Sequence, residues 1–426
     1  MRVMPVLLRY YPQLEQAWAG SLATVQQPPA PNMMDEWGKF AGQVARHFAG
    51  KVGAYEIWNE PPTDNKGAIP PEIYAQIVKE AAPAIRRSDP KATIIGFAGV
   101  DLPYMKKTLE LDTGPLMDVV SEHSYGQVNA PEVNLPSQMK EVRDLLRAAG
   151  AEKPIWHTEQ GVMADDDGYR ACMMSEADSA SLYTRNLVTC SALGVGKYFW
   201  FSAQTSPTYG AGVFYENYIP RPTLTALNAC ASFIEGLTYQ KSFNPDTGTY
   251  AHLYRGTSAV CVVWNINAPM RLSLALPSDK VKAFDTMGNP VQVVAGNDRT
   301  VVEFPMDRPV YLQCAGGDYA LLENAVAHAE VAYLDPVAVI SSASGRDIEV
   351  KVTSRSRTPQ DGIVDLVSVE GKTPAGWPTA QHFQSLGPGE SRSFTFAMPN
   401  RNDVREVRVR VGDRQMQEVK ATVTEE

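Results

Sequence analysis

The first 236 residues alternate short β-rich runs with helical runs, and this alternation restricts the fold to a parallel α/β architecture. Pro71 opens one helical run, and Gly150, Gly194 and Gly236 stand just past the ends of others, as helix chemistry favours. We expect strands at Val3–Leu8, Ala54–Trp58, Thr93–Phe97, Asp118–Glu122, Pro154–Thr158 and Lys197–Phe201. We expect helices at Asp35–Phe48, Pro71–Ser88, Leu135–Ala149, Glu176–Leu193 and Thr223–Glu235.

After Gly236 the pattern changes to short alternating runs separated by Gly- and Asn-rich turns, which is typical of all-β domains. The predicted organisation is an α/β domain over 1–236, a β-sandwich over 237–316 and a second β domain over 317–426.

Composition excludes several classes of partner. The formal net charge of −9, without a basic stripe, argues against nucleic acid. No run approaches the roughly 20 apolar residues of a membrane span. The five cysteines are scattered and lack CxxC spacing, so we expect buried thiols and no zinc site. Asp165–Asp167 lack the spacing of a calcium loop, and neither a metal nor a cofactor is predicted.

Two of the expected strands end in a glutamate. Glu60 follows Ala54–Trp58 within Asn59-Glu60-Pro61, and period-two alternation would put Glu56, Trp58 and Glu60 on one side. In barrels of parallel strands the catalytic groups lie where strands end. Taken alone, the Asn59-Glu60-Pro61 motif fits a strand-terminal glutamate that simply faces water as well as it fits a catalytic group.

Glu159 ends the strand that begins at Pro154, three strand units after the one that leads to Glu60. Strands three units apart stand nearly across the mouth of an eight-stranded barrel. Retaining hydrolysis of a glycosidic bond needs two carboxyl groups about 5–5.5 Å apart. The pair is therefore a far more specific signal than either glutamate alone.

These motifs resemble clan A of the glycoside hydrolases, most closely family 39, over residues 1 to about 236. The resemblance implies a TIM barrel of the (β/α)8 type, with Glu60 as general acid/base and Glu159 as nucleophile. It also implies that Asn59 binds the sugar 2-hydroxyl. The later domains look like the accessory β-sandwich and immunoglobulin-like modules of such enzymes.

The same resemblance implies substrate-site roles for three further residues. His123 and Tyr125 would orient the nucleophile; they belong to the motif Glu122-His123-Ser124-Tyr125. The ring of Trp200 would form the floor of the sugar-binding subsite. Each also has a structural interpretation, as a hydrogen-bonded strand end or as core packing. For Trp156 we expect packing between barrel and helices, and for His157 a buried hydrogen-bonded role.

The chain departs from the clan pattern in its strand count, because six strand units are visible where a closed barrel needs eight. If Glu60 ends strand four, strands one and two are absent. We therefore expect an N-terminally incomplete barrel, and a fragment of a longer protein that would be secreted or periplasmic.

The sequence thus predicts a retaining glycosidase that acts without cofactor on a β-linked oligo- or polysaccharide. Two alternatives remain open. One is a catalytically inactive carbohydrate-binding protein that retains the sugar cleft, and the other is a structural surface protein dominated by its β domains. Only a hydrolase needs both Glu60 and Glu159.

Overall fold

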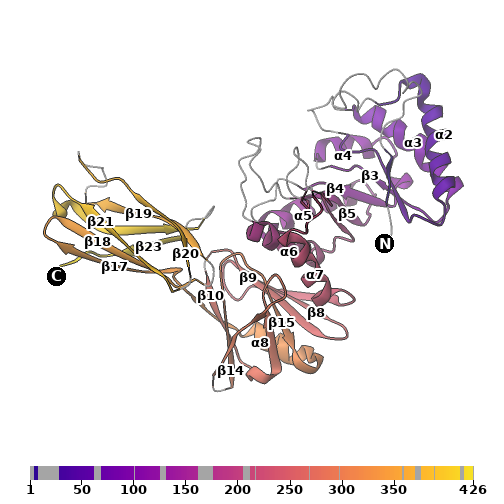
Figure 1. Ribbon diagram of the computed structural model, residues 1–426. Coiled ribbons are helices and arrows are strands. Elements are labelled where there is room, and N and C mark those ends of the chain that lie inside the picture. Colours follow the sequence, from indigo (N-terminus) through magenta and orange to yellow (C-terminus); the bar gives the residue numbers. More distant parts are fainter. Residues whose placement is uncertain are drawn as a thin grey trace. The chain divides into compact units, whose positions relative to one another are not determined.

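A computed structural model describes residues 4–7, 28–61, 69–99, 101–124, 131–161, 176–204, 212–215, 217–267, 269–296, 298–356, 359–369, 376–387, 389–412 and 417–425 (Figure 1). The chain divides into two compact units, Met1–Leu224 and Thr225–Glu426. No helix in the described part of the chain is both long and apolar enough to cross a membrane.

The first unit is built on one parallel sheet whose spatial order follows the chain, β1-β2-β3-β4-β5-β6. Its strands are β1 Val6–Leu7, β2 Ala54–Ile57, β3 Thr93–Gly96, β4 Val119–Glu122, β5 Ile155–Gln160 and β6 Tyr198–Trp200. All six expected strands are confirmed. Among the described residues β1 and β6 do not pair, so the sheet is an open half-barrel.

Helices connect the strands of this sheet (Figure 1). They are α2 Met34–Phe48, α3 Pro71–Ser88, α4 Leu102–Leu109, α5 Pro131–Ala148 and α6 Glu176–Ala192, and α7 Pro222–Ile234 follows the last strand. The five expected helices are confirmed, and α4 is an addition. Asp101 directly precedes α4, and its Oδ1 accepts a hydrogen bond from Tyr104 N at 2.8 Å and caps the first turn.

Alternation along the strands divides the side chains between the two faces of the sheet. One face packs on the helices in a core that includes Tyr55, Ile57 and Ile155. The opposite face holds a smaller cluster of Ala54, Ile95, Val119 and Trp156, with Phe199 against it. Trp156 therefore lies on the face away from the helices, and the expectation that it packs between barrel and helices is wrong.

The second unit begins with a β-sandwich of two antiparallel sheets, ordered β12-β11-β15-β9-β8-β7 and β13-β14-β10-β16. Its strands are β7 Thr238–Phe243, β8 Thr249–Arg255, β9 Ala259–Asn265, β10 Met270–Leu274, β11 Val281–Phe284, β12 Pro290–Val291, β13 Val293–Gly296, β14 Arg299–Phe304, β15 Val310–Cys314 and β16 Glu330–Tyr333. Four cysteines are buried free thiols: Cys190 on α6, Cys230 on α7, and Cys261 and Cys314 in this sandwich.

Helix α8, Tyr319–Ala327, contributes Leu322, Ala325 and Val326 to the core of this sandwich, and Val331 of β16 packs on the same core. The predicted boundary at 316/317 precedes these elements. By packing, therefore, residues 319–333 go with the first sandwich.

A second sandwich follows, with sheets β21-β18-β17-β24 and β20-β19-β22-β23 around its own core. Its strands are β17 Val337–Ser344, β18 Asp347–Ser354, β19 Gln360–Ser368, β20 Gln381–Leu386, β21 Ser391–Ala397, β22 Val404–Val411, β23 Gln417–Ala421 and β24 Thr424–Glu425.

Candidate active site

Three side chains meet at the carboxyl ends of strands β2, β4 and β5: Glu60, His123 and Glu159. One carboxylate oxygen of each glutamate and one ring nitrogen of His123 all lie within 4.8 Å of one another. The side chain of His123 is 2% exposed, whereas those of Glu60 and Glu159 are 30% and 22% exposed. The two partly exposed carboxylates thus both lie against one nitrogen, Nδ1, of a buried imidazole.

An unusual backbone turns Glu60 into this space. Trp58 and Glu60 have φ values of 71° and 45°, in the left-handed region that non-glycine residues rarely adopt. Glu60 N donates a hydrogen bond to Ala98 O at 3.0 Å, and Ala98 beyond β3 is itself left-handed at φ 43°. The ends of the two neighbouring strands therefore hold each other in these conformations.

The left-handed Trp58 interrupts the alternation expected along this segment. Its ring, 1% exposed, packs edge-on against Trp37 of α2, with centroids 5.7 Å apart. Trp58 accordingly belongs to the helix-side core, and the expectation that it shares a side with Glu56 and Glu60 is wrong.

A register shift in β5 brings two consecutive residues to the same imidazole. The pairing of β5 with β6 is irregular between His157 and Gln160. Thr158 Oγ1 lies 3.1 Å from His123 Nε2, and Glu159 Oε2 lies 3.8 Å from His123 Nδ1. In a regular strand adjacent side chains point to opposite faces, so the irregularity is what allows both contacts.

His123 connects the two glutamates electrostatically. Its Nδ1 lies 3.0 Å from Glu60 Oε1, closer than to Glu159. Burial lowers the pKa of His123, but the hydrogen bond with Glu60 and the charges of Glu159, Glu56 and Glu60 outweigh it, so the pKa is raised. The surroundings therefore favour the imidazolium form.

Behind His123 lies a buried carboxyl group to which the sequence analysis gave no role. Thr158 Oγ1 donates a hydrogen bond to Glu56 Oε1 at 2.7 Å, and Glu56 is 1% exposed. Burial raises the pKa of Glu56, opposed by hydrogen bonds from Ser121 and Thr158. The period-two pattern that places Glu56 and Thr158 on one face of the sheet was the signal available in the sequence.

The other predicted site residues are Asn59, Tyr125 and Trp200. Asn59 directly precedes Glu60 and is partly buried.

The ring of Trp200 packs edge-on against the ring of Tyr183 of α6, with centroids 4.9 Å apart, so its role as the floor of the subsite stays a prediction. Phe201, the next residue, lies just beyond the end of β6. Tyr125 lies outside the described residues, as do Asp165–Asp167.

His157 has the buried, hydrogen-bonded role that was expected. It is fully buried, and its Nδ1 lies 3.0 Å from Gln160 Oε1. Gln160 Nε2 in turn donates to Asn186 Oδ1 of α6 at 2.8 Å. Burial lowers the pKa of His157 to about 4, so the ring is neutral near neutral pH.

Glu60, His123 and Glu159 are also close enough together to share a cation. However, both ring nitrogens of His123 are engaged, one with Glu60 and the other with Thr158. A cation bound to this ring would have to break one of these contacts. We therefore interpret the cluster as a pair of carboxylates bridged by an imidazole.

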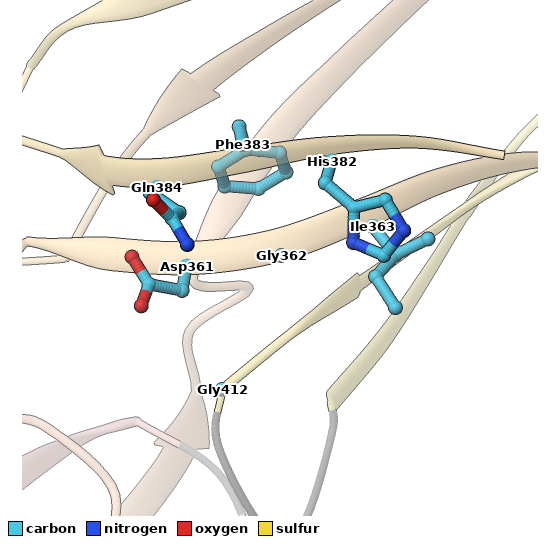
Figure 2. Close-up of a pocket in the computed structure, with 7 residues that line it drawn as sticks. All are labelled: Asp361, Gly362, Ile363, His382, Phe383, Gln384 and Gly412. Atoms are coloured by element: carbon cyan, nitrogen blue, oxygen red, sulfur yellow. The ribbon is translucent and has the colours of Figure 1, made fainter. Parts of the chain in front are cut away.

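A pocket of about 200 Å³ lies on the second sandwich, lined by Asp361, Gly362, Ile363, His382, Phe383, Gln384 and Gly412 (Figure 2). It forms where β19 shifts register against β20 between Gln360 and Gly362. One carboxylate lines it, so it lacks the paired acidic groups of the cluster around Glu60.

No protein-family profile matches the chain. A β-xylosidase from Caldicellulosiruptor saccharolyticus is 27% identical over 150 residues, covering 30% of this chain and 30% of that protein. A family 39 glycoside hydrolase from the gut symbiont Bacteroides cellulosilyticus WH2 has a TM-score of 0.58 at 19% identity, covering 70% of this chain and 65% of that one. A glucosidase from Croceicoccus marinus has a TM-score of 0.53 at 13% identity, covering 68% and 76%.

The match to the curated relative thus spans less than a third of that relative's length. The structural likeness extends over about two thirds of this chain and concerns its fold. The proteins that this chain resembles are glycoside hydrolases, in agreement with the resemblance to family 39 drawn from its strand-end motifs.

Proposed function

We propose that this protein is a retaining glycoside hydrolase in which Glu159 is the nucleophile and Glu60 the general acid/base. The observation that carries the proposal is that one oxygen of the Glu60 carboxylate lies within 4.8 Å of one oxygen of the Glu159 carboxylate. That spacing supports retention, since carboxyl groups are about 5–5.5 Å apart in retaining enzymes and about 6.5–9.5 Å apart in inverting ones.

In the first step Glu159 attacks the anomeric carbon while the glycosidic C–O bond breaks and Glu60 gives its proton to the leaving oxygen. In the second step water attacks the anomeric carbon of the glycosyl–Glu159 intermediate. Glu60 accepts a proton of the water, and the bond between the anomeric carbon and the Glu159 oxygen breaks. The negative charge moves from Glu159 to Glu60 in the first step and returns in the second. His123 lies against both carboxylates and stabilises the charge at either position.

The substrate that we propose is a β-linked glycan. A β-xylosidase and a glucosidase are among the similar proteins, which makes β-xylosides and β-glucosides the first substrates to try. Asn59 would bind the sugar 2-hydroxyl, and Trp200 or its neighbour Phe201 would contact the apolar face of the ring.

The experiment is turnover of aryl β-xyloside, β-glucoside and polysaccharide substrates by the wild type, Glu159→Gln and Glu60→Gln. We expect Glu159→Gln to lose at least about 10³-fold in kcat, because an amide cannot replace the carboxylate as the nucleophile that forms the covalent intermediate. The matched control is Glu152→Gln, whose side chain is 67% exposed and pairs with Arg147, and which should keep wild-type activity.

The stereochemistry of the first-formed product separates the mechanisms. Retention, read by proton NMR of the anomeric signal, supports double displacement, and inversion would contradict it. A folded wild type that binds glycans but cleaves none of them, with binding unaffected by Glu159→Gln, would instead favour a carbohydrate-binding protein.

A further inference from the structure

Four side chains form a continuous hydrogen-bonded chain from the buried side of the site to its reactive space: Glu56, Thr158, His123 and Glu60. A threonine hydroxyl has one hydrogen to donate. Thr158 donates it to Glu56 Oε1, so its oxygen accepts a hydrogen bond from His123 Nε2. The hydroxyl thereby fixes a hydrogen on Nε2 and leaves Nδ1 to face the two carboxylates.

We propose that Glu56, acting through Thr158, is a positioning residue that holds His123 in the one orientation and protonation state able to serve both Glu60 and Glu159. The proposal rests on the double displacement proposed above. In that reaction the negative charge shifts between two carboxylates that both contact Nδ1, at 3.0 and 3.8 Å. A fixed imidazolium stabilises both states without rearrangement, which is the physical basis of preorganised catalysis.

The charges around His123 support this arrangement. Glu56, Glu60 and Glu159 act on the ring from β2 and from the end of β5, and all three raise its pKa. His157 is a further titratable neighbour among the described residues; burial lowers its pKa to about 4, so it is neutral where the enzyme would work. Loss of the Glu56 charge, or of the Thr158 hydroxyl that transmits it, should therefore lower the pH at which His123 gives up its proton.

The decisive comparison uses two substitutions of Thr158. Thr158→Val keeps the shape of the side chain and removes the hydroxyl, whereas Thr158→Ser keeps the hydroxyl. On an aryl β-glycoside we expect Thr158→Val to lower kcat about 10- to 100-fold and to move one limb of the pH profile by about one unit, with KM changed less than about threefold. Thr158→Ser should retain the wild-type pH profile.

Glu56→Gln should reproduce the effect of Thr158→Val, and the double variant should be no worse than either single one, because both substitutions break the same chain. Glu122→Gln is the control, since it removes another buried carboxyl from a neighbouring strand and contacts Gln138 rather than His123. Equal pH profiles for Thr158→Val and Thr158→Ser would overturn the proposal, as would additive losses in the double variant.

A readout without turnover keeps the test independent of the proposed function. Nitrogen-15 NMR of the imidazole should show a protonated Nε2 in His123 of the wild type, and a lower pKa for the ring in Thr158→Val and Glu56→Gln. An unprotonated Nε2 in the wild type overturns the positioning role even if Glu159→Gln abolishes hydrolysis. A wild type that hydrolyses nothing defeats the glycosidase proposal, and the NMR result still decides how Thr158 and Glu56 set the state of His123.

Discussion

Nδ1 of His123 lies 3.0 Å from Oε1 of Glu60, and the imidazole ring is almost completely shielded from solvent. A group in this position stabilises the charge on Glu60 after it has released its proton. We expect His123→Ala to lower kcat about 10²- to 10³-fold, within the range of acid/base effects. His47→Ala, on the exposed surface of α2, should leave steady-state kinetics unchanged. Equal kinetics for the two variants would remove His123 from the mechanism.

Asn59 gives a prediction specific to the sugar. If its amide binds the 2-hydroxyl, Asn59→Ala should reduce kcat/KM about 10- to 100-fold on a β-glycoside, because contacts to this hydroxyl strengthen in the transition state. On the matching 2-deoxy glycoside the same substitution should have little effect. The measurement is the ratio of the two losses, and a ratio near one would show that Asn59 acts elsewhere.

The buried carboxyl group of Glu122 should make the free energy of unfolding depend on pH. It is fully buried, it accepts a hydrogen bond from Gln138 at 3.3 Å, and burial raises its pKa from 4.5 to about 8. The folded protein holds this proton up to about pH 8, whereas the unfolded chain releases it above about pH 4.5. The stability that the neutral carboxyl supplies is therefore fully present below pH 4.5 and is lost as the pH rises towards 8.

Glu122→Gln removes this titration. The free energy of unfolding of the variant should exceed that of the wild type at pH 8 by a few kcal/mol, at most about 5, and the difference should vanish near pH 4.5. Denaturant unfolding of both proteins at several pH values measures it. Parallel pH curves for the two proteins would show that Glu122 does not titrate in this range.

The alternation of short β-rich runs with helical runs predicted the parallel sheet, because strands that are buried on both faces are mostly apolar and are bounded by helix signals. It could not predict α4, which has only eight residues and gives too short a window for helical periodicity. It also placed Trp156 with the helices, since alternation separates two faces without saying which of them the helices cover.

At the site, the sequence predicted that Glu60 and Glu159 end strands, and the structure brings their carboxylates together. It could not predict the left-handed Trp58, whose conformation depends on contacts with Trp37 and the neighbouring strand end. Nor could it predict the register shift that turns Thr158 and Glu159 to the same imidazole, because such a shift is set by pairing with β6.

The ion pair between Glu132 and Arg185 ties α5 to α6, with side chains 1% and 5% exposed. Arg185→Met would leave the Glu132 carboxylate buried without its cation, which costs about 3–5 kcal/mol in comparable cases. The double substitution with Glu132→Leu should recover most of that loss. Hydrogen exchange of α5 and α6 is the appropriate measurement, and Lys39→Ala, which breaks an exposed pair with Glu36, should have little effect.

Gly362 in the second sandwich leaves room for the ring of Phe383. A Cβ atom at this position would lie 2.4 Å from Phe383 Cζ and 2.6 Å from Arg410 O. Both distances are shorter than the separations at which Cβ atoms are found from other heavy atoms in proteins. Phe383 is 2% exposed and packed in the core, so its ring has little space to move. We expect Gly362→Ala to destabilise this sandwich by about 1–3 kcal/mol, the usual cost of overpacking.

The matched substitution is Gly296→Ala at the end of β13, where a Cβ atom would make only ordinary contacts, the nearest being Arg299 O at 3.6 Å. There the added methyl group restricts mainly the unfolded chain, so stability should stay the same or rise slightly. Thermal unfolding of the whole protein compares the two variants, and limited proteolysis within residues 337–425 shows whether Gly362→Ala loosens the second sandwich. If Gly362→Ala were as stable as Gly296→Ala, the ring of Phe383 would have to move aside in the folded state, and the pocket of Figure 2 would change shape with it.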